Sequence, residues 1–124
     1  MTFVEENPKA VKVILQNAKD LGLSDSIKVY PKSVHSILQT ILNDGVFDFV
    51  FLDPPYEKGH EEKVIENWPW NKLISEDGRV CLEMAYSKEK EPPHSPLLKI
   101  VRDERYGDSR LVFYQLSDQL NGAE

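Results

Sequence analysis

The residues best suited to chemistry follow an apolar segment in the middle of the chain, in the stretch FLDPPYEKG (51–59). Pro54 and Pro55 fix their backbone angles and donate no backbone hydrogen bond, so a strand must end there. We expect a stiff loop in which the Asp53 carboxylate and the Pro54 carbonyl form a cluster of acceptors, with the flat face of Tyr56 beside them. Such a cluster suits a planar ring with an exocyclic amine. The acceptors hold the two N–H protons, and stacking on the tyrosine contributes about 1–3 kcal/mol.

Two limits apply to this interpretation of the loop. A base inside a duplex reaches such a loop only by flipping out or by coming from a single-stranded region. The competing interpretation is a proline-rich turn that only ends a strand; we favour the functional one because a strand of buried type runs straight into Asp-Pro-Pro-Tyr. Asp48 is a weaker candidate, since a carboxylate near the start of a strand can cap a helix or lie at the edge of the sheet.

The segments around this loop alternate between strand and helix patterns. Asn7 and Pro8 are typical of the start of a helix, and Gly22 of its end. Ser33 can cap a second helix that Gly45 ends. Apolar periodicity and turn residues predict strands at 2–6, 26–30, 46–52 and 79–85, and a third helix from about Lys58 to Asn67 after those ended by Gly22 and Gly45. They also predict a short helix or turn at 68–74, a turn at Asp77-Gly78, a polar loop at 87–96, and a closing hairpin of 97–106 and 110–116.

This order predicts an α/β fold with a mostly parallel sheet and an antiparallel C-terminal hairpin. The run at 46–52 is almost continuously apolar, so we expect it to be covered on both faces, as strands of parallel sheets are. The length of 124 residues suits one domain, which we place at 1–116, with a polar tail at 117–124.

Charge limits the way in which such a protein meets nucleic acid. The formal net charge of −6 argues against a surface that coats nucleic acid everywhere, but it permits a local basic rim around an acidic body. Candidate cations for that rim are Lys58, Lys63, Lys72, Lys88, Lys90, Arg102, Arg105 and Arg110.

Other patterns exclude further classes of protein. No apolar run approaches the roughly 20 residues that span a bilayer, and the N-terminus lacks the basic and apolar regions of a signal peptide. Cys81, the only cysteine, excludes an intramolecular disulfide and lies in an apolar run, so we expect a buried thiol. The three histidines show no metal-ligand spacing, so we predict no metal site. These features together favour the cytoplasm.

At Asp53-Pro54-Pro55-Tyr56 the sequence resembles the class I S-adenosylmethionine-dependent methyltransferases that act on exocyclic amines of nucleobases. The blocks FVEENPKAV (3–11), FDFVFLDPPYEKG (47–59) and ERYGDSRLVFYQ (104–115) together are similar to the bacterial 16S ribosomal RNA guanine-N2 methyltransferase family. They occur in that family's order and extend the similarity from residue 2 to about residue 116. The four-residue motif by itself also fits adenine-N6 DNA methylases.

The resemblance implies a Rossmann-like sheet and a role for each matching residue. Glu5 matches the acid that binds the ribose hydroxyls of S-adenosylmethionine, in agreement with the rule that an acid at a strand's carboxyl end reads ribose. Asp53 and Pro54 match the pair that holds the amine, with Asp53 also at the cofactor, and Tyr56 matches the stacking ring. The segment 106–110 matches a hairpin for which a structural turn is expected, with Gly107 in a conformation that other residues resist.

Two departures from the family pattern lead to further expectations. Lys32-Ser33 stands where the family has Gly-Asp at the cofactor's adenine, so Ser33 is left with one hydroxyl for that contact or for helix capping. The family's glycine-rich loop is expected about 20 residues before Glu5, by analogy with dinucleotide folds. We therefore expect the chain to be the C-terminal two-thirds of such an enzyme, N-terminally truncated and lacking the central first strand.

Two classes of function follow from these expectations. The first is direct methyl transfer from S-adenosylmethionine to the N2 amine of a guanine in 16S ribosomal RNA, with the RNA or the small ribosomal subunit as partner and no membrane. The second is a non-catalytic remnant that binds RNA or dimerises, by pairing or swapping at exposed sheet edges.

Overall fold

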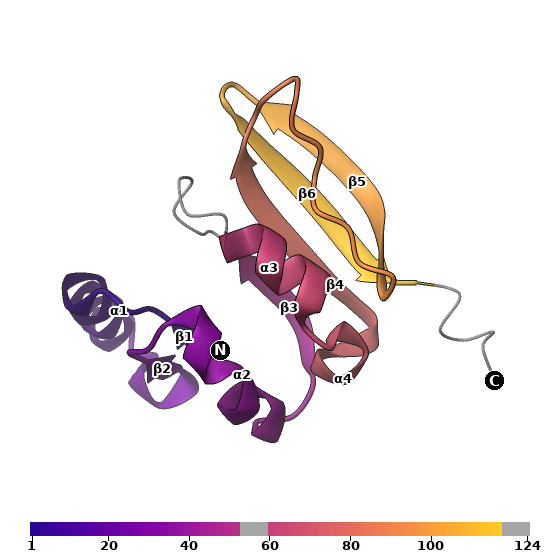
Figure 1. The fold of residues 1–124 in the computed structure, drawn as a ribbon. Helices are drawn as coiled ribbons and strands as arrows, with labels where there is room; N and C mark the ends of the chain where they lie inside the picture. The colour runs from indigo at the N-terminus through magenta and orange to yellow at the C-terminus, as the bar shows by residue number, and fades with distance from the viewer. Residues whose placement is uncertain (53–59, 118–124) are drawn as a thin grey trace. The chain divides into compact units, whose positions relative to one another are not determined.

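The computed structural model describes residues 1–52 and 60–117. The chain divides into two compact units, an N-terminal unit (Met1–Asp44) and a C-terminal unit (Gly45–Glu124), and each is described by itself. Figure 1 shows the helices and strands of both. The prediction of one domain over 1–116 with a tail at 117–124 stays a prediction, and residues 118–124 lie outside the described residues.

The N-terminal unit is a strand–helix–strand unit followed by a second helix. Its two strands pair in parallel, with Thr2 opposite Lys28 and Val4 opposite Tyr30. Its elements are β1 (Thr2–Val4), α1 (Pro8–Asp20), the short 3₁₀ helix η1 (Ser24–Ser26), β2 (Lys28–Tyr30) and α2 (Val34–Asn43). The predicted strands and helices are thus present, with β1 and β2 each shorter than their predicted ranges.

The ends of α1 follow from its sequence. Asn7 is the N-cap: its side-chain oxygen accepts a hydrogen bond from the Lys9 backbone N–H at 2.9 Å, and Pro8 opens the helix. At the other end Gly22 adopts a φ of +72°, which lets the Leu23 N–H turn back to the Ala18 carbonyl at 2.7 Å. The predicted start and end of this helix are confirmed.

The C-terminal unit contains a four-stranded sheet in the order β3-β4-β6-β5. Strand β4 pairs in parallel with β3 and antiparallel with β6, and β6 pairs antiparallel with β5. Its elements are β3 (Phe47–Leu52), α3 (His60–Asn67), α4 (Trp70–Leu73), β4 (Ile74–Ala85), β5 (Leu98–Tyr106) and β6 (Ser109–Leu116). The predicted closing hairpin is confirmed, and Gly107 in its turn has a φ of +58°.

The fold class is α/β, with parallel pairing in the strand–helix part and an antiparallel hairpin at the end, as predicted. Within residues 1–52 and 60–117, β1 pairs only with β2, and β3 only with β4. The expectation that the central first strand is lacking stays a prediction.

Two local expectations are wrong. The predicted turn at Asp77-Gly78 lies inside β4, which begins at Ile74 and bulges between its pairings with Phe47 and Phe49. The strand at 46–52 is not covered on both faces: Phe49 is 55% exposed and Phe51 52%. Apolar residues occupy both faces of β3, but alternation turns these two phenylalanines away from the buried core side chains.

Buried polar atoms in the core of the C-terminal unit have partners. Trp70 is fully buried, and its indole N–H donates to the Ile65 carbonyl at 3.1 Å. Tyr114 is 1% exposed, and its hydroxyl donates to the Pro93 carbonyl at 2.7 Å. The loop between β4 and β5, predicted to be polar, thus contributes buried prolines to the core. Burial raises the pKa of Tyr114 well above its usual range.

Cys81 is buried, as predicted, and burial together with the nearby Glu83 carboxylate raises the pKa of its thiol. In the described part of the chain, no helix is both long enough and apolar enough to span a membrane.

The Tyr114 hydroxyl provides a test of this core. Replacement of Tyr114 by Phe leaves the buried Pro93 carbonyl without its donor, which should lower the free energy of unfolding by about 1–3 kcal/mol. Urea unfolding followed by tryptophan fluorescence measures this, because Trp68 and Trp70 both lie in the C-terminal unit. The matched control is Tyr106→Phe at a position that is 57% exposed, where we expect a change within about 0.5 kcal/mol. Equal unfolding midpoints for the two variants would contradict the assigned role.

Candidate functional site

Glu5 lies between β1 and α1, directly after the last residue of β1. Its backbone N–H donates to the Tyr30 carbonyl at 3.1 Å, one residue beyond the pairing of β1 with β2. Its side-chain Oε1 accepts a hydrogen bond from the Asn7 backbone N–H at 3.1 Å. Among the described residues, no group donates a second hydrogen bond to this carboxylate. One carboxylate oxygen therefore orders the strand–helix junction, and acceptor capacity remains at the carboxyl end of β1.

Ser33 occupies the N-cap position of α2, three residues beyond the end of β2. Within the described part of the chain its side chain makes no capping hydrogen bond to the helix backbone. Its hydroxyl instead lies 3.2 Å from the Ser36 hydroxyl, which also reaches the Ser33 carbonyl at 3.2 Å. The predicted capping position is therefore correct, while the hydroxyl is engaged with another hydroxyl.

Because β1 and β2 run parallel, Glu5 and Ser33 follow carboxyl ends at the same edge of this sheet. A carboxylate at such an edge is the acceptor that a ribose diol requires. The position of Glu5 thus fits the ribose of a nucleoside cofactor. For the base of such a cofactor, Ser33 offers one hydroxyl.

The predicted catalytic residues Asp53, Pro54, Pro55 and Tyr56 lie outside the described residues. The structure does place the residue before them: Leu52 ends β3 and pairs with Leu82 of β4. The motif therefore follows directly on the carboxyl end of a parallel strand, the position at which ligands of α/β sheets bind.

Asp48 has a structural partner near the start of β3. Its Oδ1 accepts a hydrogen bond from the Ser75 hydroxyl at 3.0 Å, across the bulged part of β4. This bond links the starts of the two strands, so Asp48 does not act as a helix cap here.

The sequence indicated Lys90, Arg105 and Arg110 as candidate cations, but it did not predict that they lie in one cluster with Tyr86 and Asp103 at the C-terminal hairpin. The Arg105 guanidinium lies over the ring of Tyr86, 3.8 Å from its centroid. Arg110 donates from Nε to Asp103 at 2.7 Å and forms a second ion-pair contact through Nη2, while Nη1 donates to the Lys90 carbonyl at 3.3 Å. The pairing register of the hairpin, with Arg105 opposite Arg110, could have indicated the arginines of this cluster, but not Tyr86 or Lys90.

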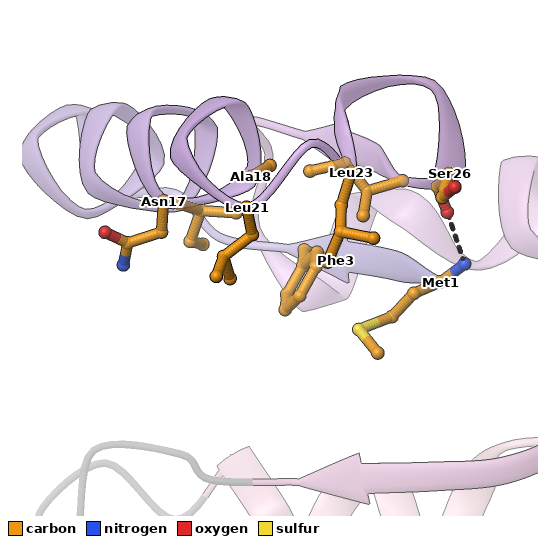
Figure 2. Close-up of a pocket in the computed structure, with 9 residues that line it drawn as sticks. Met1, Phe3, Asn17, Ala18, Leu21, Leu23 and Ser26 are labelled. Carbon is orange, nitrogen blue, oxygen red and sulfur yellow. Dashed lines mark hydrogen bonds between the residues drawn. The ribbon is translucent and has the colours of Figure 1, made fainter.

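A hollow in the N-terminal unit, shown in Figure 2, has a volume of about 560 Å³. It lies at the amino end of β1, where the N-terminal amine of Met1 donates to the Ser26 carbonyl at 3.0 Å. Its lining is mainly apolar and includes Phe3, Ile14, Ala18, Leu21, Leu23 and Ile27. No acidic or basic side chain of the described residues lines it, and the Met1 amine is bonded to the Ser26 carbonyl, so the hollow offers mainly apolar packing surface.

Comparison with known proteins places the chain in a family. The family model described as "Conserved hypothetical protein 95" matches residues 1–115. The chain belongs to this family. Among its relatives is the Bacillus subtilis (strain 168) protein named "Putative rRNA methyltransferase YlbH", 27% identical over 115 residues, which cover 91% of this chain and 61% of that protein.

Solved structures agree on the fold of this family member. A conserved hypothetical protein of Streptococcus pyogenes superposes with a TM-score of 0.77 and 28% identity, over 94% of this chain and 71% of that one. The "Putative methyltransferase yhhF" of Escherichia coli gives a TM-score of 0.74 at 18% identity, over 94% of this chain and 62% of that one. The fold is thus that of the class I methyltransferases. The chain spans about three-fifths of the length of the Bacillus relative.

The Asp103–Arg110 pair predicts a dependence of stability on pH. The hydrogen bond from Arg110 lowers the pKa of Asp103, against the opposing effect of burial. A carboxyl group with a lowered folded-state pKa stabilises the protein above its unfolded pKa of about 3.9, and this contribution is lost as the pH falls through the folded-state value. Asp103→Asn should therefore be less stable than the wild type at pH 7, and the difference should shrink below about pH 4.

Urea unfolding across a pH series measures this convergence. Asp108→Asn is the matched control, because no described group pairs with the Asp108 carboxylate. A gap between wild type and Asp103→Asn that stays constant from pH 7 to pH 3 would contradict the role given to the pair.

Proposed function

We propose that this chain carries the base-binding part of an S-adenosylmethionine-dependent ribosomal RNA methyltransferase that acts on the N2 amine of a guanine in 16S ribosomal RNA. The observation that carries the proposal is the position of Asp53-Pro54-Pro55-Tyr56 directly after Leu52, at the carboxyl end of a parallel strand. The name of the Bacillus relative, a putative rRNA methyltransferase, supports ribosomal RNA as the substrate class. The partner would be 16S ribosomal RNA or the small ribosomal subunit, in the cytoplasm.

The proposed roles follow from the chemistry of each residue. The Asp53 carboxylate and the Pro54 carbonyl each accept a hydrogen bond from one N–H group of the amine. These two bonds direct the nitrogen lone pair away from the two acceptors. Tyr56 stacks on the base, and Pro55 keeps the loop stiff. S-adenosylmethionine, when bound, supplies an electrophilic methyl group. Catalysis then depends mainly on positioning, so the chain needs neither a metal nor a nucleophilic side chain.

For the cofactor we propose Glu5 as the acceptor for the ribose hydroxyls and Ser33 as a hydroxyl contact near the base. Glu5 suits this role because one carboxylate oxygen is fixed by the Asn7 N–H, which leaves the other available at the strand's end. Asp53 would also face the cofactor, as the family resemblance implies.

A second candidate function is association without catalysis. Among the described residues β3 pairs on one side only, and two phenylalanines on it are more than half exposed. An unpaired strand edge beside exposed aromatic side chains favours pairing with another strand. A homodimer, direct or swapped, is the form that we propose for this alternative.

Transfer of a labelled methyl group tests the enzymatic proposal. We expect label in unmethylated 16S ribosomal RNA, and a loss of roughly 100-fold or more in turnover for Asp53→Ala, because that variant removes an acceptor from the reacting amine. Asp48→Ala is the matched control, since its carboxylate binds Ser75. Label that appears only in DNA adenine would replace the ribosomal assignment with an adenine-N6 DNA methylase.

Isothermal titration with S-adenosylmethionine tests the role of Glu5. Glu5→Gln removes a charged acceptor from the ribose hydroxyls and should weaken binding by about 10- to 100-fold, the effect of hydrogen bonds to a charged group. The exposed neighbour provides the control, Glu6→Gln, for which we expect wild-type affinity. Absence of binding by the folded wild-type chain would favour the non-catalytic alternative.

A further inference from the structure

Arg105 is held in place by contacts that leave its charge unneutralised. Its guanidinium stacks on the ring of Tyr86 at 3.8 Å, and its Nε donates to the Gly107 carbonyl at 2.9 Å. These two contacts fix the plane of the guanidinium and its position on the hairpin. Neither contact engages the two terminal amino groups, and Arg105 is an exposed residue of β5.

Three other cations around the β5–β6 hairpin differ from Arg105 in this respect. Arg110 pairs with Asp103, Arg102 with Glu104 at 3.0 Å, and Lys90 with Glu62 at 2.8 Å. Within residues 1–52 and 60–117, no carboxylate lies within ion-pair distance of Arg105. In a chain with a formal net charge of −6, a fixed and unpaired guanidinium forms a local binding point for an anion.

This cation lies at the end of the sheet to which β3 and β4 point. Ala85, the last residue of β4, pairs with Ser109, and the Tyr86 N–H donates to the Asp108 carbonyl in the hairpin turn at 2.7 Å. Leu52, the last residue of β3, pairs with Leu82, three residues before Ala85, or about 10 Å along the strand. Figure 1 shows β3 and β4 running in the same direction, toward the β5–β6 turn.

We propose that Arg105, held on Tyr86, binds a backbone phosphate of the substrate RNA strand and so positions that strand beyond the end of β3. This inference rests on the proposed function, because it takes the end of β3 as the place where the base is held. A guanidinium with two free amino groups matches two phosphate oxygens, which makes a bidentate contact. Stacking on Tyr86 preorganises the group, so little side-chain entropy is lost on binding.

The paired cations are expected to contribute less. Each already has a carboxylate partner, so a phosphate would have to displace that partner or bind next to its negative charge. Arg102 provides the sharpest comparison, because it lies on the same strand and carries the same charge, but its guanidinium is paired with Glu104 and lies 5.8 Å from the ring of Phe113.

The test is the salt dependence of RNA binding. The full chain and its variants Arg105→Gln and Arg102→Gln, which change the net charge equally, are titrated with a 16S ribosomal RNA fragment by fluorescence anisotropy between 50 and 200 mM salt. The slope of log K against log[salt] is negative, and loss of one phosphate contact reduces its magnitude by about 1 and weakens binding to all sequences alike. We expect this reduction for Arg105→Gln and a wild-type slope for Arg102→Gln.

A third variant separates charge from fold. Arg105→Lys keeps the positive charge but loses the planar guanidinium, so we expect it to retain the salt slope and to bind RNA more weakly. Thermal unfolding of each variant shows whether it is folded. Equal slopes for folded Arg105→Gln and Arg102→Gln would overturn the inference, as would a wild-type chain that binds no RNA. Methyl transfer to RNA with equal slopes would leave the proposed function standing without this contact. RNA binding with the predicted slopes but no methyl transfer would support the Arg105 contact and contradict the proposed function.

Discussion

Strand β4 is hydrogen-bonded along both edges and buried at its centre, and the arrangement of the C-terminal unit depends on this constraint. Val80, Cys81 and Leu82 are each 2% exposed or less, so their backbone groups cannot turn to water and need protein partners. The parallel strand β3 provides them on one side and the antiparallel strand β6 on the other. As a result, the end of β3 and the β5–β6 turn lie at the same end of one sheet.

Much of this fold could be predicted from the sequence because its signals are local. Asn7, Pro8 and Gly22 set the limits of α1 through their own backbone and side-chain chemistry, and Gly107 does the same for the hairpin turn. The exposed side of β3 could not be predicted, because an apolar strand has the same pattern whether or not another layer covers it. The bulge in β4 was also hidden, since Asp77-Gly78 looks identical in a turn and in an irregular strand.

The candidate site also has a part that the sequence predicts and a part that it does not. Asp53-Pro54-Pro55-Tyr56 is a contiguous motif, so the sequence predicts its chemistry, and Glu5 and Ser33 follow from their positions after strands. The stack of Arg105 on Tyr86 joins residues 19 positions apart, and the Arg110–Asp103 ion pair joins β6 to β5 across the hairpin. Composition shows that arginines are present; only the three-dimensional contacts show which of them keep an unneutralised charge.

The loop between β4 and β5 has a consequence for how this protein can change in evolution. The Tyr114 hydroxyl holds the Pro93 carbonyl and Arg110 holds the Lys90 carbonyl, so two points of the loop are attached to β6 at fixed places. An insertion or deletion between these points would move one carbonyl away from its donor. Length variation should therefore concentrate at the exposed residues 87–89, ahead of the first attachment, while the segment from Lys90 to Pro93 keeps a constant length.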